Sequence, residues 1–186
     1  MNKSSLNIFN ISVFLKTQIF LLPVLFLFYL DNGLNTSDYF LFQGIIVLIN
    51  VFLQIPIGLI SNYISRKKLI IVSYLIYMGR IFLWIFFKGY IVVLLGEIFY
   101  AVSKSIFDAV EAPYIYQVLK NENKESNMLK SYSSLNVALC LGTGVASILG
   151  VVLYKYCGVK ILLLTEFLII NIAVVLTKFI PRTEVN

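Results

Sequence analysis

Four ionisable residues lie within one long apolar stretch, residues 91–119, which is long enough to cross a bilayer. They are Glu97, Lys104, Asp108 and Glu111, at successive spacings of seven, four and three residues. At about 100° per residue, these spacings place all four within an arc of roughly 60° on one helix face. Because each intramembrane charge costs about 2.5 kcal/mol or more unless it is paired or hydrated, this face is expected to avoid lipid. It must look into a bundle interior or a water-filled cavity.

Two interpretations of this charged face stay open. In the first, the charges form structural ion pairs, and Lys104 and Asp108 have the i,i+4 spacing for this. In the second, the charges line a cavity, since ionisable residues inside membranes commonly mark substrate or ion pathways. Lys16, in the first apolar segment, is a candidate for the same cavity, although its ammonium can also snorkel to the membrane surface.

Arg80 and Glu97 are equidistant from the turn at Lys88 and Gly89. In an antiparallel helical hairpin both residues would lie at the same depth, roughly 13 Å from that turn at 1.5 Å per residue. We predict that they form an intramembrane ion pair with a structural role, provided that the two helices are rotated toward each other.

The composition argues against several other kinds of site. The chain has no histidine, which is the commonest metal ligand, and only two cysteines, Cys140 and Cys157. No metal site, cofactor or nucleophile–base constellation is predicted, so an enzyme is not expected. The net charge of +6 resides mainly in short loops between apolar segments, which is an orientation signal of membrane proteins and no sign of nucleic-acid binding.

The elements that carry these residues are predicted to be transmembrane helices. The 186-residue chain is 60% hydrophobic and 13% charged, whereas soluble domains carry about 25% charged residues. Six spans of about 20 residues each account for nearly the whole chain, so a single-domain, all-α integral membrane protein with six transmembrane helices is predicted. The predicted spans cover residues 11–30, with a kink at Pro23, and residues 39–60, 69–87, 91–113, 133–154 and 159–180.

Loop charges predict the orientation of the chain. Residues 31–38 carry two acids and no lysine or arginine, whereas residues 61–68 carry Arg66, Lys67 and Lys68. By the positive-inside rule, the 61–68 loop and both termini are cytoplasmic, in a multi-pass protein of the cytoplasmic membrane. The first three and the last three spans then have opposite orientations, which permits a 3+3 inverted repeat.

Small residues recur every four positions in the fifth predicted span. Such a stripe lets another helix backbone approach closely, so we expect it to serve helix packing and not to contact a ligand. The stripe comprises Ala138, Gly142, Ala146 and Gly150.

The loop between the second and third spans resembles a motif of the major facilitator superfamily. That family carries G-x-L-A-D-R-x-G-R-K/R at this place; here Gly58, Arg66 and Lys67 match, while Asn62 replaces the aspartate. Gly58 would permit close helix packing. As a cytoplasmic gate, Arg66 and Lys67 would bind helix C-terminal carbonyls or acids in one conformational state and release them in another. Asn62 keeps hydrogen-bonding ability but loses the charge.

The resemblance covers the whole chain but only the N-terminal six-helix half of that family's fold. A family member has two such halves, with the substrate site between them near the midplane. The resemblance therefore implies a second half, supplied by a homodimer or a separate chain, unless the gene is truncated. Helices one and four line the cavity in that family, which would place Lys16, Lys104, Asp108 and Glu111 on its wall.

We therefore expect a secondary active transporter, or half of one, that moves a small solute and is coupled to a gradient. Asp108 and Glu111 are candidate proton or cation carriers, and Lys16 and Lys104 are candidate counter-charges or contacts for an anionic substrate. The expected partners are the lipid bilayer, the solute and a second six-helix half. The alternative is a truncated or non-transporting membrane protein that binds a partner through the charged face or the small-residue stripe.

Overall fold

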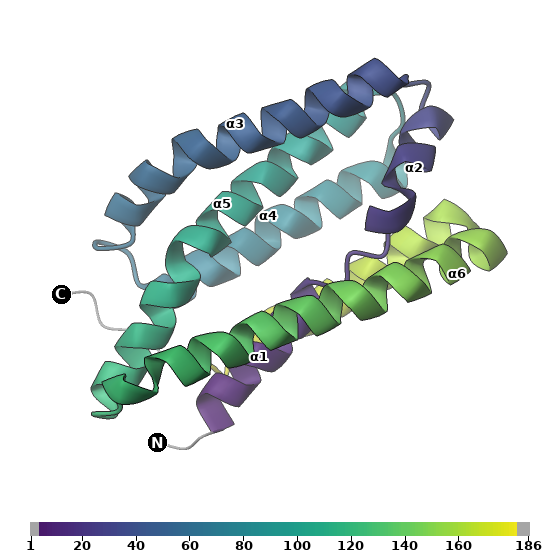
Figure 1. The fold of residues 1–186 in the computed structure, drawn as a ribbon. Helices are drawn as coiled ribbons and strands as arrows, with labels where there is room; N and C mark the ends of the chain where they lie inside the picture. Colours follow the sequence, from purple (N-terminus) through teal and green to yellow (C-terminus); the bar gives the residue numbers. More distant parts are fainter. Residues whose placement is uncertain (1–3, 182–186) are drawn as a thin grey trace.

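The computed structural model describes residues 4–181 and confirms the prediction of an all-α chain (Figure 1). Short 3-10 helices at Leu22–Val24 and Glu125–Asn127 precede α2 and α6, respectively. The α-helices of the described part are α1 Ser4–Lys16, α2 Leu25–Asp31, α3 Thr36–Ile60, α4 Arg66–Phe86, α5 Tyr90–Asn121 and α6 Met128–Thr177.

Four helical segments are long and apolar enough to cross a membrane: α3, α4, α5 and the segment that contains α6. Large apolar side chains cover their outer faces. On α3, for example, Phe40, Phe52 and Ile55 are 68%, 72% and 74% exposed. Soluble monomers rarely expose apolar surface over such a length, whereas lipid solvates it readily. Length and composition therefore indicate a multi-pass membrane protein.

Local sequence explains where two of these helices begin. The Asn35 side chain accepts a hydrogen bond from the Asp38 N–H at 3.0 Å, and the Asp38 carboxylate accepts one from the Asn35 N–H at 2.9 Å. This reciprocal capping box starts α3. The Ser65 hydroxyl caps α4 by accepting from the Lys68 N–H at 3.4 Å. The cap places Arg66 at the first position of α4.

The first predicted span, residues 11–30, is not a single helix. α1 ends at Lys16 and the first 3-10 helix begins at Leu22. Residues 17–21 between them are not helical and are called the unwound segment below. The interruption precedes Pro23, the predicted kink position. Pro23 lies instead in the first turn of a 3-10 helix, where its missing N–H leaves no helical hydrogen bond unmade.

Two other predicted boundaries are wrong. α5 does not end near Pro113 but continues through it to Asn121. The connection between the predicted spans 133–154 and 159–180 is helical apart from Gly158, whose φ of 77° and ψ of 170° reverse the direction of the chain. Glycine tolerates this positive φ because it has no Cβ. α6 therefore consists of two arms, residues 128–157 and 159–177, joined at Gly158.

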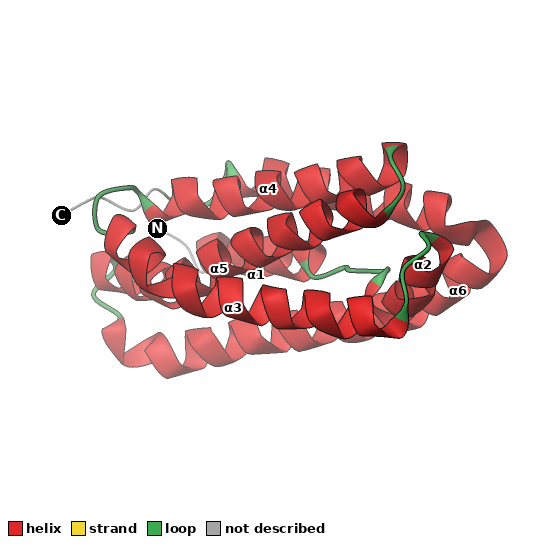
Figure 2. Cartoon of the chain, turned by 90° about the horizontal axis from the view of Figure 1, so that it is seen from above, coloured by secondary structure: helices red, strands yellow, loops and turns green. Residues whose placement is uncertain are grey.

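The two arms of α6 bring both of its ends to the same end of the bundle. The helices run roughly along one common axis, and the second arm returns alongside the others (Figures 1 and 2). At the start of α4, the Lys67 ammonium donates to the carbonyl oxygens of Lys178 and Ile180, both at 2.6 Å. Near the end of α5, the Tyr114 hydroxyl donates to the Pro181 carbonyl at 3.3 Å. The end of the second arm is thus attached to α4 and α5.

The small-residue stripe on the first arm of α6 receives α1 and the unwound segment. A Cβ at Gly142 would lie 2.0 Å from the Thr17 hydroxyl oxygen, and one at Gly150 would lie 2.0 Å from the Phe20 carbonyl oxygen. Larger side chains at Gly142 and Gly150 would push the segment away, so these small residues are what allows it to pack closely against α6. The buried members of the stripe are Gly142, Ala146 and Gly150, and Ala138 is half-buried.

Candidate functional site

A cavity of about 380 Å³ lies where α1, the unwound segment, α4, α5 and the first arm of α6 meet. Its volume is within the range of about 300–1,000 Å³ that small-molecule sites occupy. The structure brings together in its wall the four residues predicted for a substrate or coupling-ion site. These are Lys16, Lys104, Asp108 and Glu111, and aromatic rings of Tyr77, Tyr100 and Phe107 border the same space.

Lys104 and Asp108 form an ion pair one helical turn apart on α5. The distance from the ammonium nitrogen to the carboxylate oxygen is 2.5 Å, and the side chains are 43% and 30% exposed. This is the i,i+4 pair that the structural interpretation of the charged face predicts. Because the pair also borders the cavity, the two interpretations are compatible with each other.

The Lys16 ammonium has aromatic rings as its nearest described neighbours. Its nitrogen lies 3.6 Å from the centroid of the Phe107 ring and 5.6 Å from that of Tyr74. Cation–π attraction of this kind contributes about 0.5–2 kcal/mol. Within residues 4–181, no carboxylate lies within 4.0 Å of this ammonium. Its position over two core rings favours the cavity interpretation over snorkelling to the membrane surface.

Glu111 is 9% exposed and accepts one hydrogen bond, from the Tyr132 hydroxyl at 3.4 Å. No lysine or arginine of the described part lies within 4.0 Å of its carboxylate. A carboxylate offers about four acceptor positions, so Glu111 retains capacity for further donors. Of the four cavity charges, Lys16 and Glu111 are therefore the two without an ion-pair partner among the described residues.

The unwound segment between α1 and α2 forms part of the cavity wall through Thr17 and Ile19. The Gln18 amide donates to the carbonyl oxygens of Phe14 and Gly142, both at 3.2 Å. The Thr17 hydroxyl donates to the Phe14 carbonyl at 2.9 Å. Non-helical backbone at membrane depth is tolerated only where it is buried in protein or lines a water-filled cavity. Interrupted helices of this kind also build substrate sites in many transporters.

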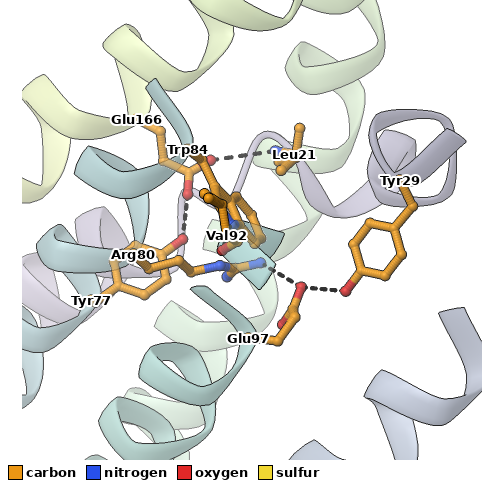
Figure 3. A network of polar contacts seen from close by, with 8 residues as sticks. All are labelled: Leu21, Tyr29, Tyr77, Arg80, Trp84, Val92, Glu97 and Glu166. Atoms are coloured by element: carbon orange, nitrogen blue, oxygen red, sulfur yellow. Dashed lines mark hydrogen bonds and ion pairs between the residues drawn. The ribbon is translucent and has the colours of Figure 1, made fainter. Parts of the chain in front are cut away.

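A second group of charges is enclosed within the bundle (Figure 3). Arg80 on α4 lies 3.3 Å from Glu97 on α5, as their equal distances from the 88–89 turn predict. The same Glu97 oxygen accepts a hydrogen bond from the Tyr29 hydroxyl at 2.6 Å. The guanidinium lies 4.1 Å from the Trp84 ring centroid and 4.5 Å from that of Tyr100. The Arg80 and Glu97 side chains are only 4% and 1% exposed, and neither borders the cavity.

Glu166, on the second arm of α6, is a buried carboxylate that neither the residue spacings nor the family motif predicted as a site residue. Its carboxylate is 3% exposed and accepts hydrogen bonds from the Tyr77 hydroxyl and from the Leu21 N–H, the latter at 3.3 Å (Figure 3). Leu21 belongs to the interrupted part of the first span, so Glu166 supplies an acceptor to a backbone donor that the interruption releases. The only signal in the sequence is a glutamate inside an apolar segment.

The basic residues of the predicted gating motif bind other helices. The Arg66 guanidinium donates to the Pro113 carbonyl at 3.0 Å and to the Gln117 side-chain oxygen at 2.6 Å, in the last three turns of α5. Lys67 binds the carbonyls of Lys178 and Ile180 at the end of α6. Cations interact favourably with the carbonyls near helix C-termini, which is the kind of contact that the motif implies.

The two other residues of the motif have different surroundings. A Cβ at Gly58 would meet nothing within 4 Å, so no other helix of the described chain packs closely against this glycine. The Gly58 carbonyl instead accepts a hydrogen bond from the Ser61 hydroxyl at 2.7 Å, which helps to end α3. Asn62, in the place of the family's aspartate, is exposed. The contacts of this loop with distant helices therefore come from its basic residues.

No protein-family model matches the chain, and no curated protein sequence matches it. Residues 4–181 contain no group of three or more histidine, cysteine, aspartate or glutamate side chains placed to hold a metal ion. The candidate site is consequently defined by its own geometry: a cavity with two lysines and two carboxylates beside an interrupted helix.

Proposed function

We propose that the chain is a secondary active transporter, or half of one, that moves a small solute across the cytoplasmic membrane and is coupled to a proton or solute gradient. The observation that carries this proposal is the cavity lined by Lys16, Lys104, Asp108 and Glu111 within an apolar helical bundle. Charges inside a membrane are costly and mark substrate and ion pathways. Ion pairs that served stability alone would not need to border a space of about 380 Å³.

The proposed architecture is a six-span bundle similar to the N-terminal half of the major facilitator fold. In this proposal α1 and α2 together make the first crossing, α3, α4 and α5 make the next three, and the arms of α6 make the last two. Both chain ends then lie on the cytoplasmic side, together with the basic residues Arg66 and Lys67. A second six-helix half, from a second copy or a separate chain, completes the cavity.

Within this cavity, Asp108 and Glu111 are the proposed carriers of the coupling proton or cation, with Lys16 and Lys104 as counter-charges. Asp108 is held by Lys104 at 2.5 Å, so an incoming ion competes with that ammonium. Glu111 has no competing cation within 4.0 Å in the described part of the chain. A ligand shifts a conformational equilibrium only by binding one state more tightly, and a change in these pairings supplies such a difference.

The contacts of Arg66 and Lys67 provide a candidate cytoplasmic gate for the same cycle. They attach the start of α4 to α5 and to the end of α6. Charge-assisted hydrogen bonds are strong enough to stabilise one state, and they exchange readily with water when helices move apart. In the proposed cycle these bonds close the cytoplasmic side and break when it opens.

Gradient-driven uptake into proteoliposomes tests the proposal. The solutes to be offered are labelled amino acids, sugars, organic cations and organic anions, with and without an imposed proton or sodium gradient. We expect at least one solute to accumulate with the native chain, and Asp108→Asn or Glu111→Gln to abolish the gradient-driven part. Lys124→Gln is the matched control, because Lys124 pairs with Glu122 in a cytoplasmic-side loop at 3.0 Å and lies outside the cavity.

Unchanged coupled uptake in both carboxylate variants would remove the carrier assignment. Absence of uptake for every solute, from a protein that is folded and monodisperse, would favour the alternative: a membrane protein that binds a partner through its charged face or its small-residue stripe and transports nothing.

A further inference from the structure

The four cavity charges divide into a closed pair and an open pair. Lys104 and Asp108 neutralise each other across 2.5 Å. Lys16 and Glu111 border the same cavity, but neither has an ion-pair partner within 4.0 Å among the described residues. The open pair therefore offers one cation and one anion to whatever occupies the cavity.

The balance of charges in the cavity limits the net charge of the ligand that it can bind. Two lysines and two carboxylates sum to zero, so a ligand with a net charge would leave one charge in the cavity without a counter-charge. A ligand that carries both an ammonium and a carboxylate keeps the balance and satisfies both open groups. Taking the transport cavity of the proposed function as the site, we propose that its substrate is a small zwitterion. Its carboxylate binds Lys16 and its ammonium binds Glu111.

The uncharged residues that line the cavity indicate which side chain the ligand carries between its two charged groups. The rings of Tyr77, Tyr100 and Phe107 and the side chain of Leu139 border the cavity. Ligand sites of this type combine mostly apolar and aromatic walls with a few polar groups that fix orientation. The walls favour an apolar or aromatic side chain between the two charged contacts. An α-amino acid with such a side chain has the required chemistry.

Occupation of Glu111 by the ligand has a consequence for coupling. A carboxylate bound to the ammonium of the substrate is not available to a coupling proton or cation at the same time. Substrate and coupling ion then bind Glu111 alternately, which makes their exchange across the membrane obligatory when each binds a different state. Tyr132, which donates to this carboxylate at 3.4 Å, stays beside it in either case.

Three matched compounds test the assignment by calorimetric binding to the purified full chain in detergent at neutral pH. Phenylalanine carries both charges, 3-phenylpropanoate lacks the ammonium, and 2-phenylethylamine lacks the carboxylate. We expect phenylalanine to bind at least about tenfold more tightly than either analogue, because each analogue leaves one cavity charge unpaired. Equal binding of the three compounds, or no binding by any of them, overturns the assignment.

Variants of the open pair give the second measurement. Lys16→Met and Glu111→Gln should each weaken phenylalanine binding by about 10- to 100-fold, which is the range that one charge-assisted hydrogen bond supplies. Lys124→Gln should leave it unchanged. The exchange variant, Lys16→Glu with Glu111→Lys, keeps one cation and one anion in the cavity. It should bind more tightly than Lys16→Glu alone, and it serves as the test if a neutralised variant fails to fold.

Uptake into proteoliposomes separates failure of this assignment from failure of the transport proposal. Coupled uptake of a solute that is not a zwitterion, together with no phenylalanine binding, refutes the zwitterion and retains transport. Selective phenylalanine binding that depends on Lys16 and Glu111, without uptake of any solute, retains the zwitterion site and refutes transport.

Discussion

Helix α5 carries two groups of charged residues that differ in environment although they lie on one face. At Glu97 the ion pair with Arg80 is enclosed, with side chains that are 4% and 1% exposed. Farther along the helix, the Lys104–Asp108 pair is 43% and 30% exposed and borders the cavity. Each group is an ion pair, and the acids Glu97 and Asp108 lie on the same face of α5. The difference therefore comes from what lies opposite each group.

The neighbours of each group explain the difference. Around Glu97, the Tyr29 hydroxyl and the Arg80 guanidinium bind one carboxylate oxygen, and the Trp84 ring lies against the guanidinium. Around Lys104 and Asp108, the neighbouring first span is interrupted, and its unwound residues line a space instead of filling it. The comparison shows that charges on one face of a helix are enclosed or border a cavity according to the side chains and backbone that lie opposite them.

Cysteine labelling in membranes tests this comparison directly and has the largest expected effect. The exposed native residues Cys140 and Cys157 are first replaced by serine. Cysteines placed at Lys104 and Asp108 should then react with a hydrophilic thiol reagent, because thiolates form and react where water is present. A cysteine at Ser73, which is fully buried, is the control and should stay unreacted.

The outcome of this labelling decides whether the cavity is hydrated. Positions 104 and 108 protected in every condition tested, like position 73, would mean that water does not reach the cavity. The contrast between the two groups of charges would then disappear, and the transport proposal with it.

Neutralising one acid of each group should give a second contrast, in stability. Glu97→Gln leaves the enclosed Arg80 guanidinium without its anion, which costs about 3–5 kcal/mol in buried pairs. Asp108→Asn is the matched control, since loss of a half-exposed pair costs about 0–1 kcal/mol. Thermal unfolding in detergent and the yield of folded protein measure both effects. Equal stability of the two variants would show that the enclosed pair contributes no more to the free energy of unfolding than the half-exposed pair does.

Exchanging the two members of the enclosed pair sharpens the same test. The variant with Arg80→Glu and Glu97→Arg keeps the two opposite charges in contact, so it should recover part of the folded yield lost by either single neutralisation. Full recovery is not expected, because the Tyr29 hydroxyl donates to residue 97 and the Trp84 ring lies against residue 80. No recovery at all would argue against an ion pair at this place.

The smallest effect concerns the interruption that opens the cavity. Gly150→Ala would place a Cβ 2.0 Å from the Phe20 carbonyl oxygen, and overpacking of this kind costs about 1–3 kcal/mol. Gly144→Ala, on the same arm with nothing within 4 Å of its Cβ, should be neutral or stabilise by up to about 1 kcal/mol. Thermal unfolding of the pair measures the difference. If Gly150→Ala were as stable as Gly144→Ala, the stripe would not hold the unwound segment.

Much of the candidate site could be predicted from the sequence because helix periodicity is a local property. The spacings of Lys104, Asp108 and Glu111 fix their common face, and the structure places all three at one cavity. The register of Arg80 and Glu97 follows from the hairpin turn between them. The rotation of the two helices toward each other could not be derived, since it depends on packing against α2 and α6.

The interruption of the first span could not be predicted in the same way. The unwound positions 18 and 19 hold Gln and Ile and no glycine or proline, and Pro23 predicts a kink at a later position. The partners that stabilise the interruption are the Gly142 carbonyl and the Glu166 carboxylate, which are more than 100 residues away in the chain. A break that long-range acceptors stabilise leaves no local signal in the sequence.

Composition and residue spacing were enough to predict that the chain is helical and apolar, which charges share a helix face, and which pair of charges shares a depth. These properties follow from composition and from the fixed rise and turn of a helix. Which charges are enclosed and which border a cavity became known only from the packing of the helices. Enclosure depends on which side chains and backbone lie opposite each group, and part of these surroundings comes from α6, far along the chain.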